Sequence, residues 1–382
     1  MEKTIEKKRG LAAIFALCPA AHITALVSAL VIAVHLLLRG KPEAMQWLSD
    51  RLIHPIHRWL SLLCAKADFS VAELVIGIFA VNVIVYITCR IIKLVRCKDK
   101  LKEVYITFAS LLSAALAVYG LFCIMWGTYY YGDDFMARSG LPSDEISVAE
   151  LEDVTRYFAA LSNEYSGGVE RDENGVCCAD RVRILNASTE VFKTVEERFP
   201  FLQGDEAAAK GVYFSRVMSY TDFTGFFFPF TGEANVNIDF PPSLFASTVA
   251  HELSHQRGVA KEQEANFTAV LVCMSSGDRD YLYSGCLMAY IYLGNALHDA
   301  DYEAWQEVYG GLNENVLADL AANRAYWAQF DTPVQSVSNT VYEGFLQSYD
   351  QTLGLKSYGA CVDLLVNYYG GAASEYLEES HS

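Results

Sequence analysis

Three long apolar runs in the first third of the chain constrain the fold more than any other feature of the sequence. They cover residues 11–38, 71–95 and 104–127, and the first contains no Asp, Glu, Lys or Arg. At about 1.5 Å per residue, a helix of such length crosses the roughly 30 Å hydrocarbon core of a bilayer. We therefore predict three transmembrane helices within residues 1–127 and a separate domain in residues 128–382.

Basic residues in the short connections predict the orientation of these spans. They gather at the N-terminus and around the second connection: Lys3, Lys7, Lys8, Arg9, Arg90, Lys93, Arg96, Lys98, Lys100 and Lys102. Short loops rich in Lys and Arg stay on the cytoplasmic side. We expect the N-terminus inside and residues 39–70 outside, together with everything after residue 128. Within 39–70, the amphipathic stretch around Trp59 is expected to lie along the outer interface.

Charge separates the two parts of the chain. Residues 1–127 hold 15 Lys and Arg against 8 Asp and Glu, whereas residues 128–382 hold 14 against 38. Because such an acidic surface repels the phosphate backbone of nucleic acid, we do not expect nucleic acid as a partner. We expect instead the lipid bilayer and a peptide or protein in extended conformation. The ten cysteines form no CxxC pair and are expected to be free thiols.

Residues 128–382 read as mainly helical with one short β segment. Apolar periodicity predicts helices over 146–166, 186–203, 281–297, 301–309, 314–328, 335–352 and 357–369. The exception is 222–240, where aromatic and β-branched residues favour strand and Pro229 restricts that strand to an edge or a bulge. A packed hydrophobic loop is the alternative. An edge strand here would pair with an extended peptide.

The chemistry lies in residues 247–267, which read STVAHELSHQRGVAKEQEANF. We predict a helix over 243–257. Because helical residues four apart share a face, His251 and His255 can bind one zinc ion. Glu252, beside them, can accept a proton from a metal-bound water and pass it on. Gly258 permits a sharp turn after the helix.

The third metal ligand is open between two glutamates. Catalytic zinc usually takes three protein ligands, and Glu262 and Glu264 both follow the turn. On a helix that begins near 260 they point in different directions, so they cannot both face the ion. Glu262 is favoured because Asn266, four residues on, can hold the far nitrogen of a ligating imidazole. His298 and His381 are less suitable, one at the end of a distant helix and the other near the C-terminus.

These residues carry a resemblance to known families. HELSH followed by EQEANF resembles the zincin metallopeptidases whose third ligand is the glutamate of an E-x-x-A-D or E-x-x-A-N segment, which implies Glu262 here. Membrane-embedded CAAX-type peptidases and some bacterial regulator-cleaving peptidases share that pattern. In this chain only six residues separate His255 from Glu262, fewer than in those relatives.

The wider sequence resembles a bacterial family of uncharacterised three-span membrane proteins, recognised by a domain of unknown function over nearly the whole chain. The likeness rests on the three spans together with WGTYYYG, FPFTGEANVN, HELSHQRG and GLKSYGACVDLL. It implies three membrane helices in the bacterial cytoplasmic membrane, followed by a mostly helical, zincin-like extracytoplasmic domain with a small β edge.

The sequence thus predicts a membrane-anchored zinc endopeptidase of the HExxH type with its active site outside the cytoplasmic membrane. Candidate donors to a transition-state oxyanion are Tyr358, His298 and Tyr290. The alternative function is a zinc-binding sensor or assembly factor that docks a cell-envelope partner without hydrolysis. Glu252 favours the enzyme, because a site that only binds metal needs no general base.

Overall fold

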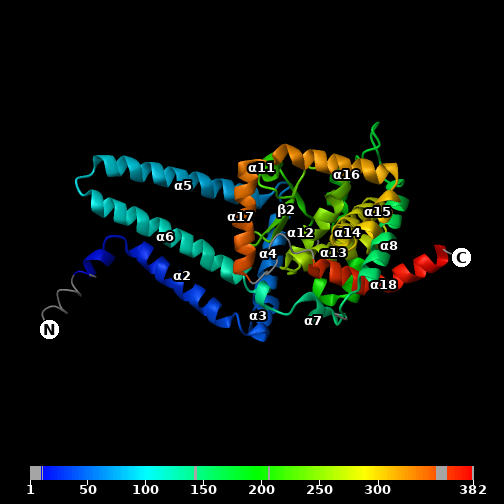
Figure 1. The fold of residues 1–382 in the computed structure, drawn as a ribbon. Helices are drawn as coiled ribbons and strands as arrows, with labels where there is room; N and C mark the ends of the chain where they lie inside the picture. Colours follow the sequence, from blue (N-terminus) through cyan, green and yellow to red (C-terminus); the bar gives the residue numbers. More distant parts are fainter. Residues whose placement is uncertain (1–9, 11, 142–143, 205–206, 350–358, 381–382) are drawn as a thin grey trace. The chain divides into compact units, whose positions relative to one another are not determined.

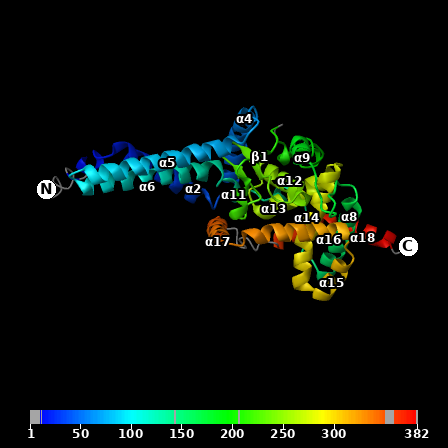
Figure 2. The same cartoon turned by 90° about the horizontal axis from the view of Figure 1, so that it is seen from above.

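The computed structural model describes residues 10, 12–141, 144–204, 207–349 and 359–380, and these are mainly helical (Figure 1; Figure 2). They form two compact units. The first, here the membrane unit, comprises the chain up to Ile53 and Ala72–Gly132. The second, the globular unit, comprises His54–Val71 and the chain from Asp133 onward.

The membrane unit contains three helices long and apolar enough to cross a membrane, which confirms the predicted number of spans. They are α2 (Pro19–Leu38), α5 (Val71–Arg96) and α6 (Lys100–Met125). The prediction for the first span was wrong at its start, because α2 begins at Pro19 and not at residue 11. Proline lacks the N–H that a helix interior needs, so it is accommodated in the first turn. Arg90 of α5 pairs with Glu103 of α6.

Short elements complete this unit between the spans. They are α3 (Pro42–Leu48), the π-helical turn η1 (Ser49–Ile53) and the 3₁₀ turn η2 (Tyr129–Tyr131). α2 packs along α6, where Gly120 lies close to the backbone of Ser28. A β-carbon at Gly120 would lie 3.5 Å from the carbonyl oxygen of Ser28, an ordinary van der Waals contact.

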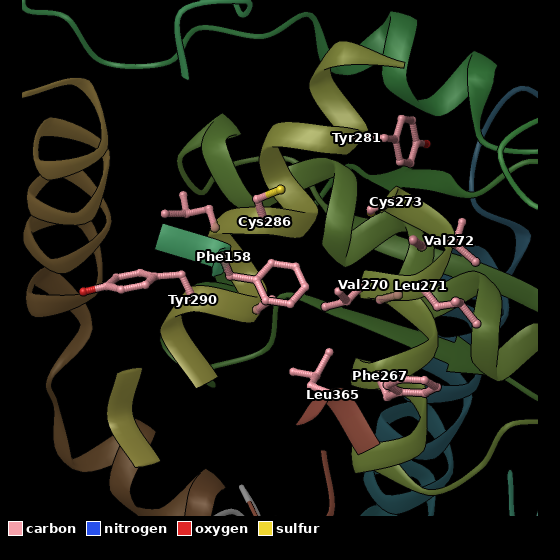
Figure 3. Packing of buried hydrophobic residues seen from close by; sticks show 14 of the residues in the cluster. Phe158, Phe267, Val270, Leu271, Val272, Cys273, Tyr281, Cys286, Tyr290 and Leu365 are labelled. Carbon is pink, nitrogen blue, oxygen red and sulfur yellow. The ribbon is translucent and has the colours of Figure 1, made fainter. Parts of the chain in front are cut away.

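The globular unit is built mostly of helices: α4 (His54–Cys64), α7 (Phe135–Ser139), α8 (Val148–Ser166), α9 (Arg181–Ala187), α10 (Lys193–Arg198), α11 (Ser215–Tyr220), α12 (Phe245–Gln256), α13 (Glu262–Ser275), α14 (Arg279–Ala300), α15 (Tyr302–Gly310), α16 (Glu314–Trp327), α17 (Pro333–Ser348) and α18 (Gly359–Ser380). Short 3₁₀ turns lie at Pro200–Leu202, Pro242–Leu244 and Ala328–Phe330. α14 packs against α8 and α13, and α18 packs against the same two helices. Figure 3 shows the resulting core, in which Phe158, Phe267 and Leu365 come from α8, α13 and α18.

Most helices of this unit follow the predicted ranges, but α18 continues to Ser380, well past the predicted end at residue 369. The clearest error is 186–203, where the chain forms α9 and α10 separated by a turn, then a 3₁₀ turn. The residue before a proline is disfavoured in helical conformation, and Phe199 before Pro200 has an extended φ of −124°. The continued apolar pattern arises because Val191 and Phe192, within the turn, are also buried. All ten cysteines are free thiols, as expected.

A three-stranded sheet precedes α12 in the sequence. Its strands are β1 (Lys210–Val212), β2 (Gly225–Phe228) and β3 (Glu233–Asn237), in the order β1-β3-β2. β1 runs parallel to β3 and β2 runs antiparallel to it. Strand character in 222–240 is confirmed, but the prediction of a single edge strand was wrong: the segment forms two antiparallel strands, of which β2, just before Pro229, is at the edge and β3 is central. β3 is buried at every position instead of alternating, because it is central and both α12 and α4 pack on it.

Candidate metal centre

Helix α12 carries both histidines of the candidate centre. The centroids of the His251 and His255 rings lie 4.6 Å apart and the rings are nearly perpendicular. After the helix ends, Gly258 adopts a φ of 86°, a left-handed conformation that glycine tolerates without a steric penalty. The chain therefore turns sharply, and α13 begins at Glu262 against the same face of α12.

Glu262 supplies the third potential ligand. Its Oε2 lies 3.3 Å from Nε2 of His251 and 3.6 Å from Nε2 of His255. The three ligand atoms all lie within 4.8 Å of one another. Two atoms bound to one tetrahedral zinc at about 2.1 Å are separated by about 3.4 Å. The spacing of Glu262 from both imidazoles therefore fits a shared metal ion.

Neighbouring groups orient these ligands. Nδ1 of His255 lies 2.7 Å from the carbonyl oxygen of Val259, which accepts its proton, so Nε2 is the ring nitrogen that faces Glu262 and would bind metal. The hydroxyl of Tyr342, on α17, donates a hydrogen bond of 2.7 Å to Oε1 of Glu262. This bond leaves Oε2 directed at the two imidazoles. Nδ1 of His251 is buried and has no hydrogen-bond partner among the described residues.

Charge within the cluster shifts the pKa values of its members. Burial alone would lower the pKa of His255, but the charge of Glu262 and its hydrogen bond raise it to about 9. Enclosure of Glu262 opposes its ionisation, yet the charge of His255 and hydrogen bonds from both imidazoles hold its pKa well below the usual value. In the absence of a metal, Glu262 is thus an anion next to the protonated ring of His255.

Glu252 lies beside this cluster without being one of its three ligands. Its side chain is 3% exposed, and Oε2 has no hydrogen-bond partner among the described residues. Burial raises the pKa of Glu252 to about 7, although the charges of His251 and His255 lower it in part. A carboxyl group with a pKa near neutrality can both accept and donate a proton at physiological pH.

The edge strand β2 begins directly against Glu252. A β-carbon at Gly225 would lie 2.4 Å from Oε1 of Glu252, so only glycine fits there. Among the described residues β2 pairs with β3 alone. The side chain of Glu252 therefore lies against the face of the sheet at the first residue of this edge strand.

The remaining sequence candidates lie elsewhere or have other partners. Glu264 accepts a hydrogen bond from the backbone N–H of Phe135 at 3.1 Å and pairs with Lys261, so its carboxylate is used away from the histidines. Asn266 makes no hydrogen bond with Nδ1 of His251, which has no partner in the part of the chain that the structure describes, and Nδ1 of His255 is hydrogen-bonded to the carbonyl oxygen of Val259 instead.

The proposed oxyanion donors are not brought to the centre by the structure. His298 is at the end of α14, where its ring makes an edge-to-face contact with Trp305 and a hydrogen bond with Asp299. Tyr290 is buried in the core cluster with its ring against Gly294. Tyr358 lies outside the described residues. Tyr342, which the sequence analysis did not single out, is the tyrosine that reaches the ligand cluster.

Family comparison places the chain by its overall sequence. A family model described as "Protein of unknown function (DUF3810)" matches residues 49–366. The chain belongs to this family. The matched DUF3810 region contains α5, α6, the sheet and every residue of the candidate centre. No curated protein and no solved structure matches the chain.

Proposed function

We propose that this DUF3810 member is a membrane-anchored, zinc-dependent peptidase that hydrolyses extended polypeptides outside the cytoplasmic membrane. The observation that carries the proposal is the convergence of His251, His255 and Glu262 next to a buried Glu252, whose Oε2 has no hydrogen-bond partner among the described residues. A site that only stored or sensed zinc would have no use for a protonatable carboxyl group held beside the ligands.

The residues divide into metal ligands and a proton carrier. Nε2 of His251, Nε2 of His255 and Oε2 of Glu262 would hold the zinc and leave one position open. Bound zinc acidifies a water molecule and polarises a carbonyl group. Glu252 would accept the proton of that water at its free Oε2 and later donate it to the leaving amine.

The sheet supplies a reason for choosing a peptide substrate. β2 is an edge strand in the described sheet, and its first residue, Gly225, lies against the side chain of Glu252. An extended peptide that added a strand to β2 would lie near the proton carrier. On the basis of the basic connections, we propose that residues 128–382 lie outside the cytoplasmic membrane. Activity of a reporter enzyme that works only in the cytoplasm, fused after residue 349, would contradict this orientation.

The test combines metal content with hydrolysis on the full chain in detergent. Wild type, Glu252→Gln and Glu264→Gln should each hold about one zinc per chain, whereas Glu262→Gln should lose it. Only wild type and Glu264→Gln should digest a peptide library. Zinc bound by wild type without any hydrolysis would favour the sensor or assembly factor, and zinc retained by Glu262→Gln would refute the ligand set.

A further inference from the structure

Two segments of the globular unit adjoin the membrane spans in the sequence, and both make hydrogen bonds within the unit. Ser70 donates a hydrogen bond of 2.6 Å to Asn235 of β3, and the N–H of Val71 donates to Glu233 of the same strand at 3.1 Å. Val71 is the first residue of span α5. The span therefore begins at hydrogen-bond distance from the central strand of the sheet.

The second connection leads to the first turn of α13. α6 ends at Met125, and soon afterwards the N–H of Phe135 donates to Glu264 in the first turn of α13. Glu264 is two residues from the candidate ligand Glu262. The two segments of the globular unit that adjoin the spans in the sequence thus contact β3 and the first turn of α13.

Exposed apolar side chains gather on three helices at one end of the globular unit. In both views α4, α11 and α17 lie at one end of the globular unit, while α8, α15 and α18 lie at the other (Figure 1; Figure 2). α17 exposes Val334, Val337 and Val341 at 56%, 64% and 67%. Their spacing of three and four places them on one helical face.

The other two helices add aromatic and aliphatic groups. The exposed residues on α4, on α11 and just before α11 are Trp59, Leu62, Leu63, Tyr213, Phe214, Val217 and Tyr220. Tryptophan and tyrosine partition well into the membrane–water interface. β1 connects the two sets, because Lys210 bonds the carbonyl groups of Cys64 and Phe69.

The same helices lack the negative charge of the rest of the unit. Within α4, α11 and α17, Glu343 is the single acidic residue, and Arg58 and Arg216 are the basic residues. By contrast, residues 128–382 hold 38 Asp and Glu. An acidic surface would be repelled by the anionic headgroups of a membrane, so the depletion fits contact with lipid.

We propose that this docking face, formed by the exposed apolar residues of α4, α11 and α17 with Tyr213 and Phe214, rests on the bilayer that holds the chain's own spans. α17 then has lipid on its valine side and the metal centre on its other side, where Tyr342 bonds Glu262. If the proposed peptidase function holds, its substrates are the segments of membrane-anchored polypeptides that lie next to the bilayer surface.

The test reads membrane contact directly and requires neither metal nor activity. The full chain is placed in lipid nanodiscs after the cysteines that are not buried, Cys18, Cys89, Cys97 and Cys178, are replaced by alanine. A nitroxide spin label is attached to Val337→Cys, to Val217→Cys and, as a control at the opposite end, to Glu303→Cys on α15. Power saturation compares access of oxygen, which concentrates in lipid, with access of a water-soluble nickel chelate.

Labels at residues 337 and 217 should favour oxygen over nickel by several-fold, and the label at 303 should show the reverse. Adding Val334→Glu and Val341→Glu should move the label at 337 toward the value at 303. Nickel access at 337 equal to that at 303 would overturn the proposal. So would spin–spin broadening at 337 with access to neither reagent, because a second copy of the chain would then cover the face.

Discussion

The hydroxyl group of Tyr342 lies 2.7 Å from Oε1 of Glu262, although the two residues are 80 positions apart in the chain. Glu262 directs its other oxygen at His251 and His255. A hydrogen bond to one carboxylate oxygen restricts rotation of the group and so fixes the other oxygen. Tyr342 is therefore a positioning residue for the candidate metal ligand.

Replacing that hydroxyl should weaken metal binding without removing a ligand. We expect Tyr342→Phe to lower zinc affinity by about 10-fold or more, the range seen when a ligand loses its outer hydrogen bond. The measurement is competition for zinc with a chromophoric chelator. Tyr326→Phe is the matched control, because its hydroxyl bonds Ser219 and Asp239 and no member of the centre. Equal affinity of wild type and Tyr342→Phe would show that Glu262 is positioned without this bond.

A methyl group at Gly225 should disable the proton carrier while sparing the metal. The added β-carbon of Gly225→Ala would lie 2.4 Å from Oε1 of Glu252, so the carboxyl group or β2 has to move. We expect hydrolysis to fall at least 10-fold, zinc content to stay near one per chain, and stability to drop by about 1–3 kcal/mol from overpacking.

Gly370→Ala provides the comparison, since nothing lies within 4 Å of a β-carbon at that position of α18. Hydrolysis by this variant should match wild type. If Gly225→Ala also retained full activity, the close approach of β2 to Glu252 would have no part in the reaction.

The fold was predictable wherever a local pattern decides the structure. The three spans follow from uninterrupted apolar runs, and α5 begins at Val71 as expected. Two of the errors lie where a single proline overrides periodicity: Pro19 at the start of α2 and Pro200 after α10. Neither proline interrupts the apolar pattern, so a prediction from periodicity alone extends each helix through its proline.

The site was predictable only as far as it is local in sequence. His251, His255 and the turn at Gly258 lie within one helix and its end, so helical spacing relates them. Tyr342 and Gly225 reach the centre through packing of α17 and β2, which no spacing rule describes. One tyrosine among 23 carries no signal of its own, and the sequence therefore pointed to other tyrosines.

Zinc binding should release protons near neutral pH. In the metal-free centre the pKa of His255 is raised to about 9, so the ring holds a proton at pH 7 that zinc has to displace. Affinity should therefore increase with pH and level off above about pH 9. Calorimetric titration in two buffers of different ionisation enthalpy measures the released protons, and we expect roughly one at pH 7. His298→Ala should release the same number, and a heat of binding independent of the buffer would contradict the protonated state.

Stability of the sheet should depend on one enclosed lysine. Nζ of Lys210 pairs with Glu233 at 2.8 Å and also bonds the carbonyl groups of Cys64 and Phe69. The two charged side chains are only 12% and 3% exposed. Lys210→Met leaves the carboxylate of Glu233 buried without its cation, which costs about 3 kcal/mol and should lower the thermal midpoint by roughly 5 to 10 °C.

Lys193→Met distinguishes this effect from the loss of any ion pair. Lys193 pairs with Glu190 at the surface, where both side chains are more than half exposed, and such pairs contribute below about 1 kcal/mol. Thermal unfolding of the full chain, followed by tryptophan fluorescence, should therefore show little change in this control. Adding Glu233→Gln to Lys210→Met should recover part of the loss, because no buried charge then lacks a partner. A Lys210→Met midpoint equal to that of Lys193→Met would mean that water reaches Glu233 and that the sheet does not rely on the pair.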